Sequence, residues 1–190
     1  HALAVLELMG ELQVLPDVVA CNAAISACEK AVQWQSALAL LGRMPLLRVP
    51  ANTITCNAAT SACENAGEWR CALSLLASAA QISVVLDAIS FNAAMSACAK
   101  GSQWLLAVAL LSTMSQACVA LNVISCSAAI GACGKCGKWQ RAVALLRSMP
   151  QLRILSDIIC CSAVIGACER GGQRRIALEL LGGLPRIALR

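Results

Sequence analysis

The chain has 190 residues, of which 59% are hydrophobic but only 3% aromatic, so its interior must be built from Ala, Leu, Val, Ile and Cys. The only His is at position 1 and Tyr is absent, which leaves no nucleophile and base pair from which an active site could be assembled, and no enzymatic activity is expected. The net charge of +5 is unevenly distributed along the chain. Residues 1–99 carry four basic and seven acidic side chains, whereas residues 100–190 carry eleven basic and three acidic ones. A polyanionic partner would therefore favour the C-terminal half.

The sequence repeats every 35 residues without an insertion. Residues 1–17 align with 36–52 and are read as the second half of a truncated repeat. Four complete repeats follow, and then a near-complete one: 18–52, 53–87, 88–122, 123–157 and 158–190. A fixed period of this length indicates one supersecondary unit that is copied and stacked, and therefore one continuous repeat domain. The chain is expected to be a segment of a longer array.

Each repeat is predicted to be a pair of antiparallel helices. In the first repeat, two sets of apolar residues have the i, i+3, i+4, i+7 spacing of a helix face: Cys21, Ala24, Ile25, Cys28 and then Ala37, Leu40, Leu41, Met44. Gly in most of the short turns between them allows the backbone to reverse. An Asp or Asn precedes every first helix and is expected to cap it: Asp17, Asn52, Asp87, Asn122 and Asp157. Pro45, Pro150 and Pro185 are expected to end three of the second helices. The predicted fold is an all-α solenoid of about eleven helices.

The 13 Cys residues follow the repeat, which argues against a disulfide framework. One column with a 35-residue spacing consists of Cys21, Cys56, Cys126 and Cys161 with Phe91 in the fifth place, and another of Cys28, Cys63, Cys98, Cys133 and Cys168. A column that accepts Phe is a packing position, and buried free Cys behaves as a small hydrophobe, so a reducing compartment is expected. The Cys133–Cys136 pair has CxxC spacing but no second ligand pair nearby, and no metal or cofactor is predicted.

Two other features are interpreted as packing. The stretch between Lys100 and Lys135 has no charge, but it is in register with segments of other repeats that do carry charges, so a membrane span is not expected. The second helices begin with a Trp in four repeats. These aromatic side chains are predicted to fill the space between hairpins rather than to stack on bases: Trp34, Trp69, Trp104 and Trp139.

A polar row follows the face of the first helices opposite the Cys columns. Each helix carries a small polar residue, a minimal residue four positions later and usually a cation four positions after that: Asn22, Ser26, Lys30; Asn57, Ser61, Asn65; Asn92, Ser96, Lys100; Ser127, Gly131, Lys135; Ser162, Gly166, Arg170. Such a row suits a single RNA strand whose bases face the small polar residues and whose phosphates face the cations. The same residue types are also ordinary at helix starts and ends, so the pattern alone leaves open a solenoid that binds a peptide or protein in its groove.

The 35-residue unit with N-A-A-I-S-A-C-E-K-x-x-Q-W-x-x-A-L-x-L-L, preceded by an aliphatic pair and two further residues, resembles the P-type motif of the pentatricopeptide repeat (PPR) family over essentially the whole chain. The resemblance implies a right-handed superhelix that binds single-stranded RNA. It also implies that the fifth and last residues of each repeat read one base, that the second residue flanks the base, and that motifs run 5′ to 3′ from the N to the C terminus.

Carried onto this sequence, the resemblance implies four pairs of base-reading residues and a fifth reader, Ser162, whose partner would lie beyond the chain. The pairs are Asn22 with Asn52, Asn57 with Asp87, Asn92 with Asn122, and Ser127 with Asp157. They resemble pyrimidine, uracil, pyrimidine and guanine readers, so the implied site is 5′-Y-U-Y-G-3′. The base-flanking residues would be Val19, Ile54, Ile89, Ile124 and Ile159, and the phosphate-contacting ones Lys30, Lys100, Lys135 and Arg170.

The resemblance further implies a role in organellar RNA processing, stability, editing or translation, in the matrix of mitochondria or plastids. A targeting peptide and any site for protein effectors would lie in flanks outside this segment. Neither a membrane nor a small-molecule substrate is expected as a partner.

Overall fold

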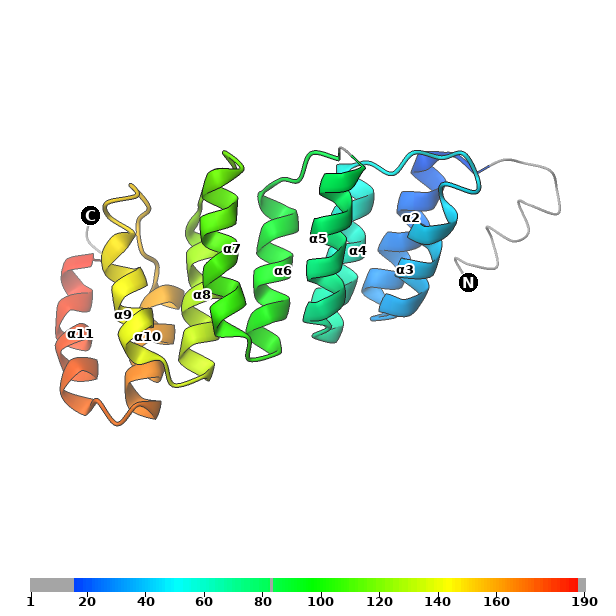
Figure 1. Cartoon of the computed structure of the whole chain (residues 1–190). Helices are drawn as coiled ribbons and strands as arrows, with labels where there is room; N and C mark the ends of the chain where they lie inside the picture. Colours follow the sequence, from blue (N-terminus) through cyan, green and yellow to red (C-terminus); the bar gives the residue numbers. More distant parts are fainter. Residues whose placement is uncertain (1–15, 83, 188–190) are drawn as a thin grey trace. The chain divides into compact units, whose positions relative to one another are not determined.

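The computed structural model describes residues 16–82 and 84–187, in which all regular elements are α-helices (Figure 1). Within each repeat two helices form an antiparallel hairpin. The first helices are α2 (Val18–Lys30), α4 (Thr53–Ala66), α6 (Ala88–Lys100), α8 (Val123–Lys135) and α10 (Ile158–Arg170). The second helices are α3 (Trp34–Arg43), α5 (Trp69–Gln81), α7 (Trp104–Gln116), α9 (Trp139–Ser148) and α11 (Arg174–Ile187). The half-repeat proposed for residues 1–17 lies almost entirely outside the described residues.

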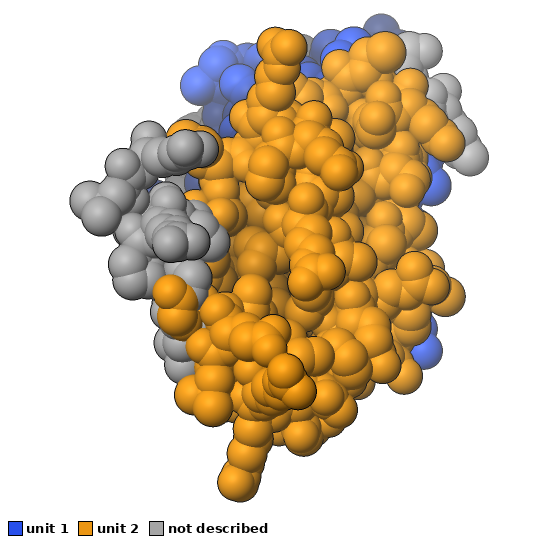
Figure 2. All heavy atoms as spheres, turned by 90° about the vertical axis from the view of Figure 1, so that its left-hand side faces the viewer, with its two compact units in different colours: residues 1–97 blue, residues 98–190 orange. Residues whose placement is uncertain are grey.

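The chain divides into two compact units, residues 1–97 and 98–190, with the boundary inside α6 (Figure 2). In the first unit α2 packs against α3 and α4, and α4 also packs against α3 and α5. In the second unit α8 packs against α7, α9 and α10, and α10 packs against α9 and α11. In both units a first helix therefore contacts its own partner and the first helix of the next repeat. This arrangement confirms the prediction of an all-α solenoid of stacked hairpins.

Small side chains fill the spaces between the stacked helices. In the first unit the core is centred on Ile25, and in the second on Ile130, both of which are fully buried. The column of five Cys predicted to pack inside the solenoid is buried, and these Cys are free thiols: Cys28, Cys63, Cys98, Cys133 and Cys168. No group of three or more potential metal-ligating side chains occurs among the residues that the structure describes.

Three of the four Trp residues predicted to pack lie against the cores of the two units. Trp34 lies against the core of the first unit, and Trp104 and Trp139 lie against that of the second. Trp139 also covers Gly171 in the turn of the following repeat, where a Cβ atom would lie only 2.3 Å from Trp139 Cδ1. These three side chains are partly buried and contribute to the packing of the cores.

Two further expectations concern helix ends and the membrane. The helices α3 and α9 end just before Pro45 and Pro150, as predicted, but α11 continues through Pro185 to Ile187, so that prediction was wrong. A Pro in the last turn removes only one backbone hydrogen bond, and this loss does not prevent the two residues after Pro185 from remaining helical. No helix within residues 16–82 and 84–187 is long and apolar enough to span a bilayer.

The turn between the two helices of each repeat contains one residue with a positive φ angle. Three of the five are Gly, as the sequence predicted, but Val32 and Ser102 adopt the same left-handed conformation with φ of 56°. The other three are Gly67, Gly137 and Gly172. The β-branched Val32 is thus held by its neighbours in a backbone conformation that L-residues disfavour.

Replacing Val32 with Gly is expected to raise the free energy of unfolding by about 1 kcal/mol, because Gly removes the steric penalty of the left-handed conformation. The greater conformational entropy of Gly in the unfolded chain offsets part of this gain. Urea denaturation followed by circular dichroism measures the change. Gly137→Ala is the matched control: no atom lies within 4 Å of the added Cβ, so the expected loss of stability is due to the backbone alone. A Val32→Gly protein less stable than the wild type would contradict the prediction.

Candidate nucleic-acid interface

An exposed column of aliphatic side chains follows the first helices of all five repeats. The second residue of each repeat lies in the first turn of its helix and has between 58% and 67% of its surface exposed: Val19, Ile54, Ile89, Ile124 and Ile159. Other apolar positions of the same helices, such as Ile25 and Ile130, are fully buried. These five aliphatic residues therefore lie outside the core and are accessible to a binding partner.

Beside this column, the structure brings together two predicted reader pairs in the first unit. Asn57 Nδ2 donates to Asp87 Oδ2 at 3.0 Å, and Asn22 Nδ2 donates to Asn52 Oδ1 at 3.5 Å. In each pair the partners are 30 residues apart and lie at the start of consecutive first helices. Each pair therefore presents an amide and a second polar group side by side.

The readers of the later repeats lie partly in the second unit. Asn92 is half-buried in α6 of the first unit, and Asn122 precedes α8 of the second unit. In the second unit Ser127 Oγ donates to the carbonyl of Ile124 at 3.0 Å, and Ser162 Oγ donates to that of Ile159 at 2.9 Å. These hydroxyls turn back onto their own helix and keep their lone pairs available to accept a hydrogen bond.

The last residue of each repeat is also the N-cap of the next first helix. Asp17 accepts from Ala20 N at 2.8 Å, and Asp157 accepts from Cys160 N at 2.8 Å. Asn52, Asp87 and Asn122 cap their helices in the same way. Helix capping thus accounts for the Asp and Asn at this position. The fifth-position Asn22 and Asn57 cap no helix, and each donates to the side chain of the last residue of its own repeat.

The structure adds a third residue that the sequence did not single out. Thr55 Oγ1 lies 2.6 Å from Asn22 Oδ1, and Ser90 Oγ donates to Asn57 Oδ1. Both hydroxyls are fully buried at the third position of the following repeat. The only signal in the sequence is that this position holds Thr or Ser in the middle three repeats.

The four cations predicted to contact phosphates are exposed at the ends of their first helices: Lys30, Lys100, Lys135 and Arg170. Arg170 also has a structural contact, because its Nε donates to the carbonyl of Gly134 in the preceding repeat at 2.8 Å. Asn65, which interrupts the basic row, donates to the carbonyl of Glu29 at 3.4 Å in the same way. This position therefore links consecutive first helices, a role that the sequence did not predict for it.

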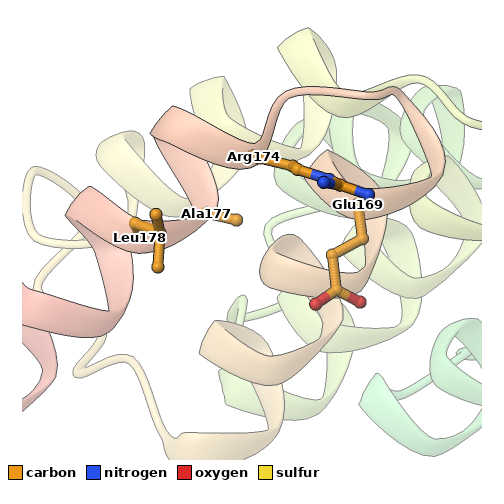
Figure 3. A pocket seen from close by; sticks show the side chains of 4 residues that line it. All are labelled: Glu169, Arg174, Ala177 and Leu178. Atoms are coloured by element: carbon orange, nitrogen blue, oxygen red, sulfur yellow. The ribbon is translucent and has the colours of Figure 1, made fainter.

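A cavity of about 390 Å³ lies in the last repeat, next to the end of α10 (Figure 3). Glu169 lines it from α10, and Arg174, Ala177 and Leu178 line it from α11. Glu169 is ten residues after Ile159, which is roughly 15 Å along an α-helix. The cavity is therefore at the hairpin end of the repeat and separate from the base-reading position.

The fold is that of a helical-repeat protein whose first helices carry polar pairs beside a column of exposed aliphatic residues. The PPR repeat pattern matches residues 19–49, 89–119 and 124–154. The chain belongs to the pentatricopeptide repeat family.

Solved structures of this family share the fold. The chain is 20% identical to the pentatricopeptide repeat protein PPR10 from maize, covering 98% of this chain and 27% of that chain with a TM-score of 0.76. It is 23% identical to PPR10 in complex with an 18-nt psaJ RNA element, with a TM-score of 0.81, and the match covers 97% of this chain and 27% of PPR10. It is 14% identical to the PPR domain of Arabidopsis thaliana protein-only RNase P 1 in complex with tRNA, with a TM-score of 0.77, and the match covers 91% of each chain. The chain thus spans about a quarter of the length of PPR10, and no curated protein matches its sequence.

Proposed function

We propose that this chain binds single-stranded RNA in a sequence-dependent manner, with one base at each repeat and the order 5′-Y-U-Y-G-3′. The observation that carries the proposal is the column of exposed aliphatic residues beside hydrogen-bonded polar pairs. The flat faces of a base suit the aliphatic side chains, and its polar edge suits the pairs. The RNA complexes of PPR10 and of the protein-only RNase P PPR domain support the same function.

The second motif illustrates the chemistry. A base between Ile54 and Ile89 presents its Watson–Crick edge to Asn57 and Asp87. Uracil offers a carbonyl oxygen to the Asn57 amide and its N3–H to the Asp87 carboxylate. Cytosine has an acceptor at N3, which would face a carboxylate without a proton between them. The pair therefore favours uracil.

We further propose that binding itself is the activity, and that it acts on organellar transcripts in the matrix of mitochondria or plastids by occupying a site or recruiting effector proteins. Fluorescence anisotropy with RNAs that carry CUCG or the reversed order GCUC in identical flanks tests sequence-dependent binding. Preference for CUCG supports RNA recognition. Equal binding of both RNAs, or of neither, would leave a solenoid that binds a peptide or protein.

The basic row supports a prediction about salt. Lys135→Ala is expected to lower the slope of log K against log salt concentration by about 0.7, because one phosphate contact is lost on a single strand. Lys138→Ala is the matched control: it removes the same charge in the same unit, but its Nζ lies over the ring of Trp104, 5.8 Å from the centroid. The control slope should equal that of the wild type. A Lys135→Ala slope equal to that of the wild type would place the phosphates elsewhere.

A further inference from the structure

Buried hydroxyl groups hold the amides of the base-reading Asn residues in the first unit. Thr55 Oγ1 lies 2.6 Å from Asn22 Oδ1 and 2.9 Å from Asn52 Oδ1. Ser90 Oγ donates to Asn57 Oδ1 and lies 3.4 Å from the capping carboxylate that precedes it. Each hydroxyl has one proton, and the shorter contact assigns it to the reading Asn of the preceding repeat.

These hydrogen bonds fix which way the Asn57 amide faces. Its Oδ1 accepts from Ser90, and its Nδ2 donates to Asp87 Oδ2 at 3.0 Å. A flipped amide would place Oδ1 against the carboxylate oxygen of Asp87, with no proton between the two acceptors. In the observed orientation the amide oxygen is engaged by the protein, and the second N–H of Nδ2 remains to donate to a base.

A role in helix capping does not account for this contact. Thr55 completes a capping box, in which its oxygen accepts from the backbone N–H of Asn52 at 3.1 Å. That interaction uses a lone pair of the hydroxyl and leaves its proton, which is donated to Asn22 in the neighbouring helix. The proton therefore serves the reading residue and not the cap.

The sequence shows the same association across the repeats. Each fifth-position Asn is followed 33 residues later by Thr or Ser: Asn22 by Thr55, Asn57 by Ser90 and Asn92 by Ser125. The fifth-position Ser127 is followed by Cys160, a weak donor, and Ser127 Oγ turns to the carbonyl of Ile124. Within this chain the buried hydroxyl therefore accompanies Asn readers.

We propose that Thr55 and Ser90, the third residues of the repeats that follow Asn22 and Asn57, are positioning residues for base choice, which orient these two reading Asn side chains as hydrogen-bond donors. This inference rests on the proposed function, because it assigns the bound group as a base. For Asn57, the Ser90 hydroxyl engages the amide oxygen, which would otherwise accept from the exocyclic amine of cytosine. The hydroxyl thus favours uracil without contacting the base.

The test compares Ser90→Ala, Ser90→Thr and wild-type full chains in competition binding with two RNAs, CUCG and CCCG in identical flanks. Ser90→Ala is expected to reduce the preference for uracil about fivefold, the effect of one neutral hydrogen bond. Ser90→Thr retains the hydroxyl and is expected to retain the preference. Thr60→Val is the control, because the Thr60 hydroxyl is buried but donates to the carbonyl of Cys56 at 2.7 Å and touches no reader.

The outcomes separate the two proposals. A wild-type chain that binds CUCG and CCCG equally would overturn uracil reading at the second motif and this inference together, whereas equal binding of CUCG and GCUC would overturn the proposed function. A wild-type preference that Ser90→Ala retains would overturn this inference alone, and so would an equal loss of affinity for both RNAs, since a purely structural role weakens binding without changing base choice. A reduced preference that Ser90→Thr restores would support it.

Discussion

Replacing Asp87 with Ser is expected to move the base preference of the second motif from uracil toward cytosine, with a change of about tenfold in the ratio of the two affinities. The Asp87 carboxylate accepts from Asn57 Nδ2 at 3.0 Å, so both groups lie where one base edge would meet them. Ser shortens the side chain, removes the charge and supplies a hydroxyl proton that cytosine N3 accepts. Competition between the CUCG and CCCG RNAs measures the ratio.

The same substitution separates reading from capping. Asp87 Oδ1 accepts from the backbone N–H of Ile89 at 3.0 Å and of Ser90 at 3.1 Å, which is the ordinary role of an N-cap. Ser caps helices about as well as Asp, so the free energy of unfolding should change by only a few tenths of a kcal/mol. Asp87→Asn reproduces the Asn–Asn pair of the first motif and should bind both pyrimidines. An unchanged ratio in both variants would show that Asp87 is a cap and nothing more.

The free energy of unfolding is expected to fall steeply between pH 9 and pH 11. Burial raises the pKa of Cys98 and Cys133 from 9.0 to about 11, and that of Cys63 and Cys160 to about 12. Because the folded-state pKa is raised, each thiol contributes stability that is complete below the unfolded pKa and is lost as the pH rises through the folded pKa. Each thiol contributes about 1.4 kcal/mol per pH unit in this window, so the four together contribute about 6 kcal/mol per pH unit.

Urea denaturation under reducing conditions at several pH values measures this slope. Cys63→Ala removes one buried thiol and is expected to reduce the slope by about 1.4 kcal/mol per pH unit. Cys118→Ala makes the same substitution at an exposed thiol and should leave the slope as in the wild type. A Cys63→Ala slope identical to that of the wild type would contradict the pH linkage assigned to this buried thiol.

Local chemistry made much of the fold predictable from the sequence. The apolar spacing around Ile25, repeated every 35 residues, predicted the helices and their buried faces because side-chain direction along a helix depends only on spacing. The capping by Asp17 and Asp157 was predictable for the same reason, since an N-cap bonds to a backbone N–H three residues away. Trp139 was predictable as packing because an interior with so few aromatics needs bulk.

Contacts between repeats required the tertiary structure. The partners of Thr55 and Ser90 lie 33 residues earlier, and Arg170 contacts a carbonyl 36 residues earlier. Such bonds form only when two helices stack at a separation that the small core side chains determine, and rotamers then decide among several possible partners. The sequence by itself determined the repeat, its helices and its caps, because each depends on a few neighbouring residues. Only the stacking of helices decided which hydroxyl holds Asn22, and that the cation at Arg170 links two repeats.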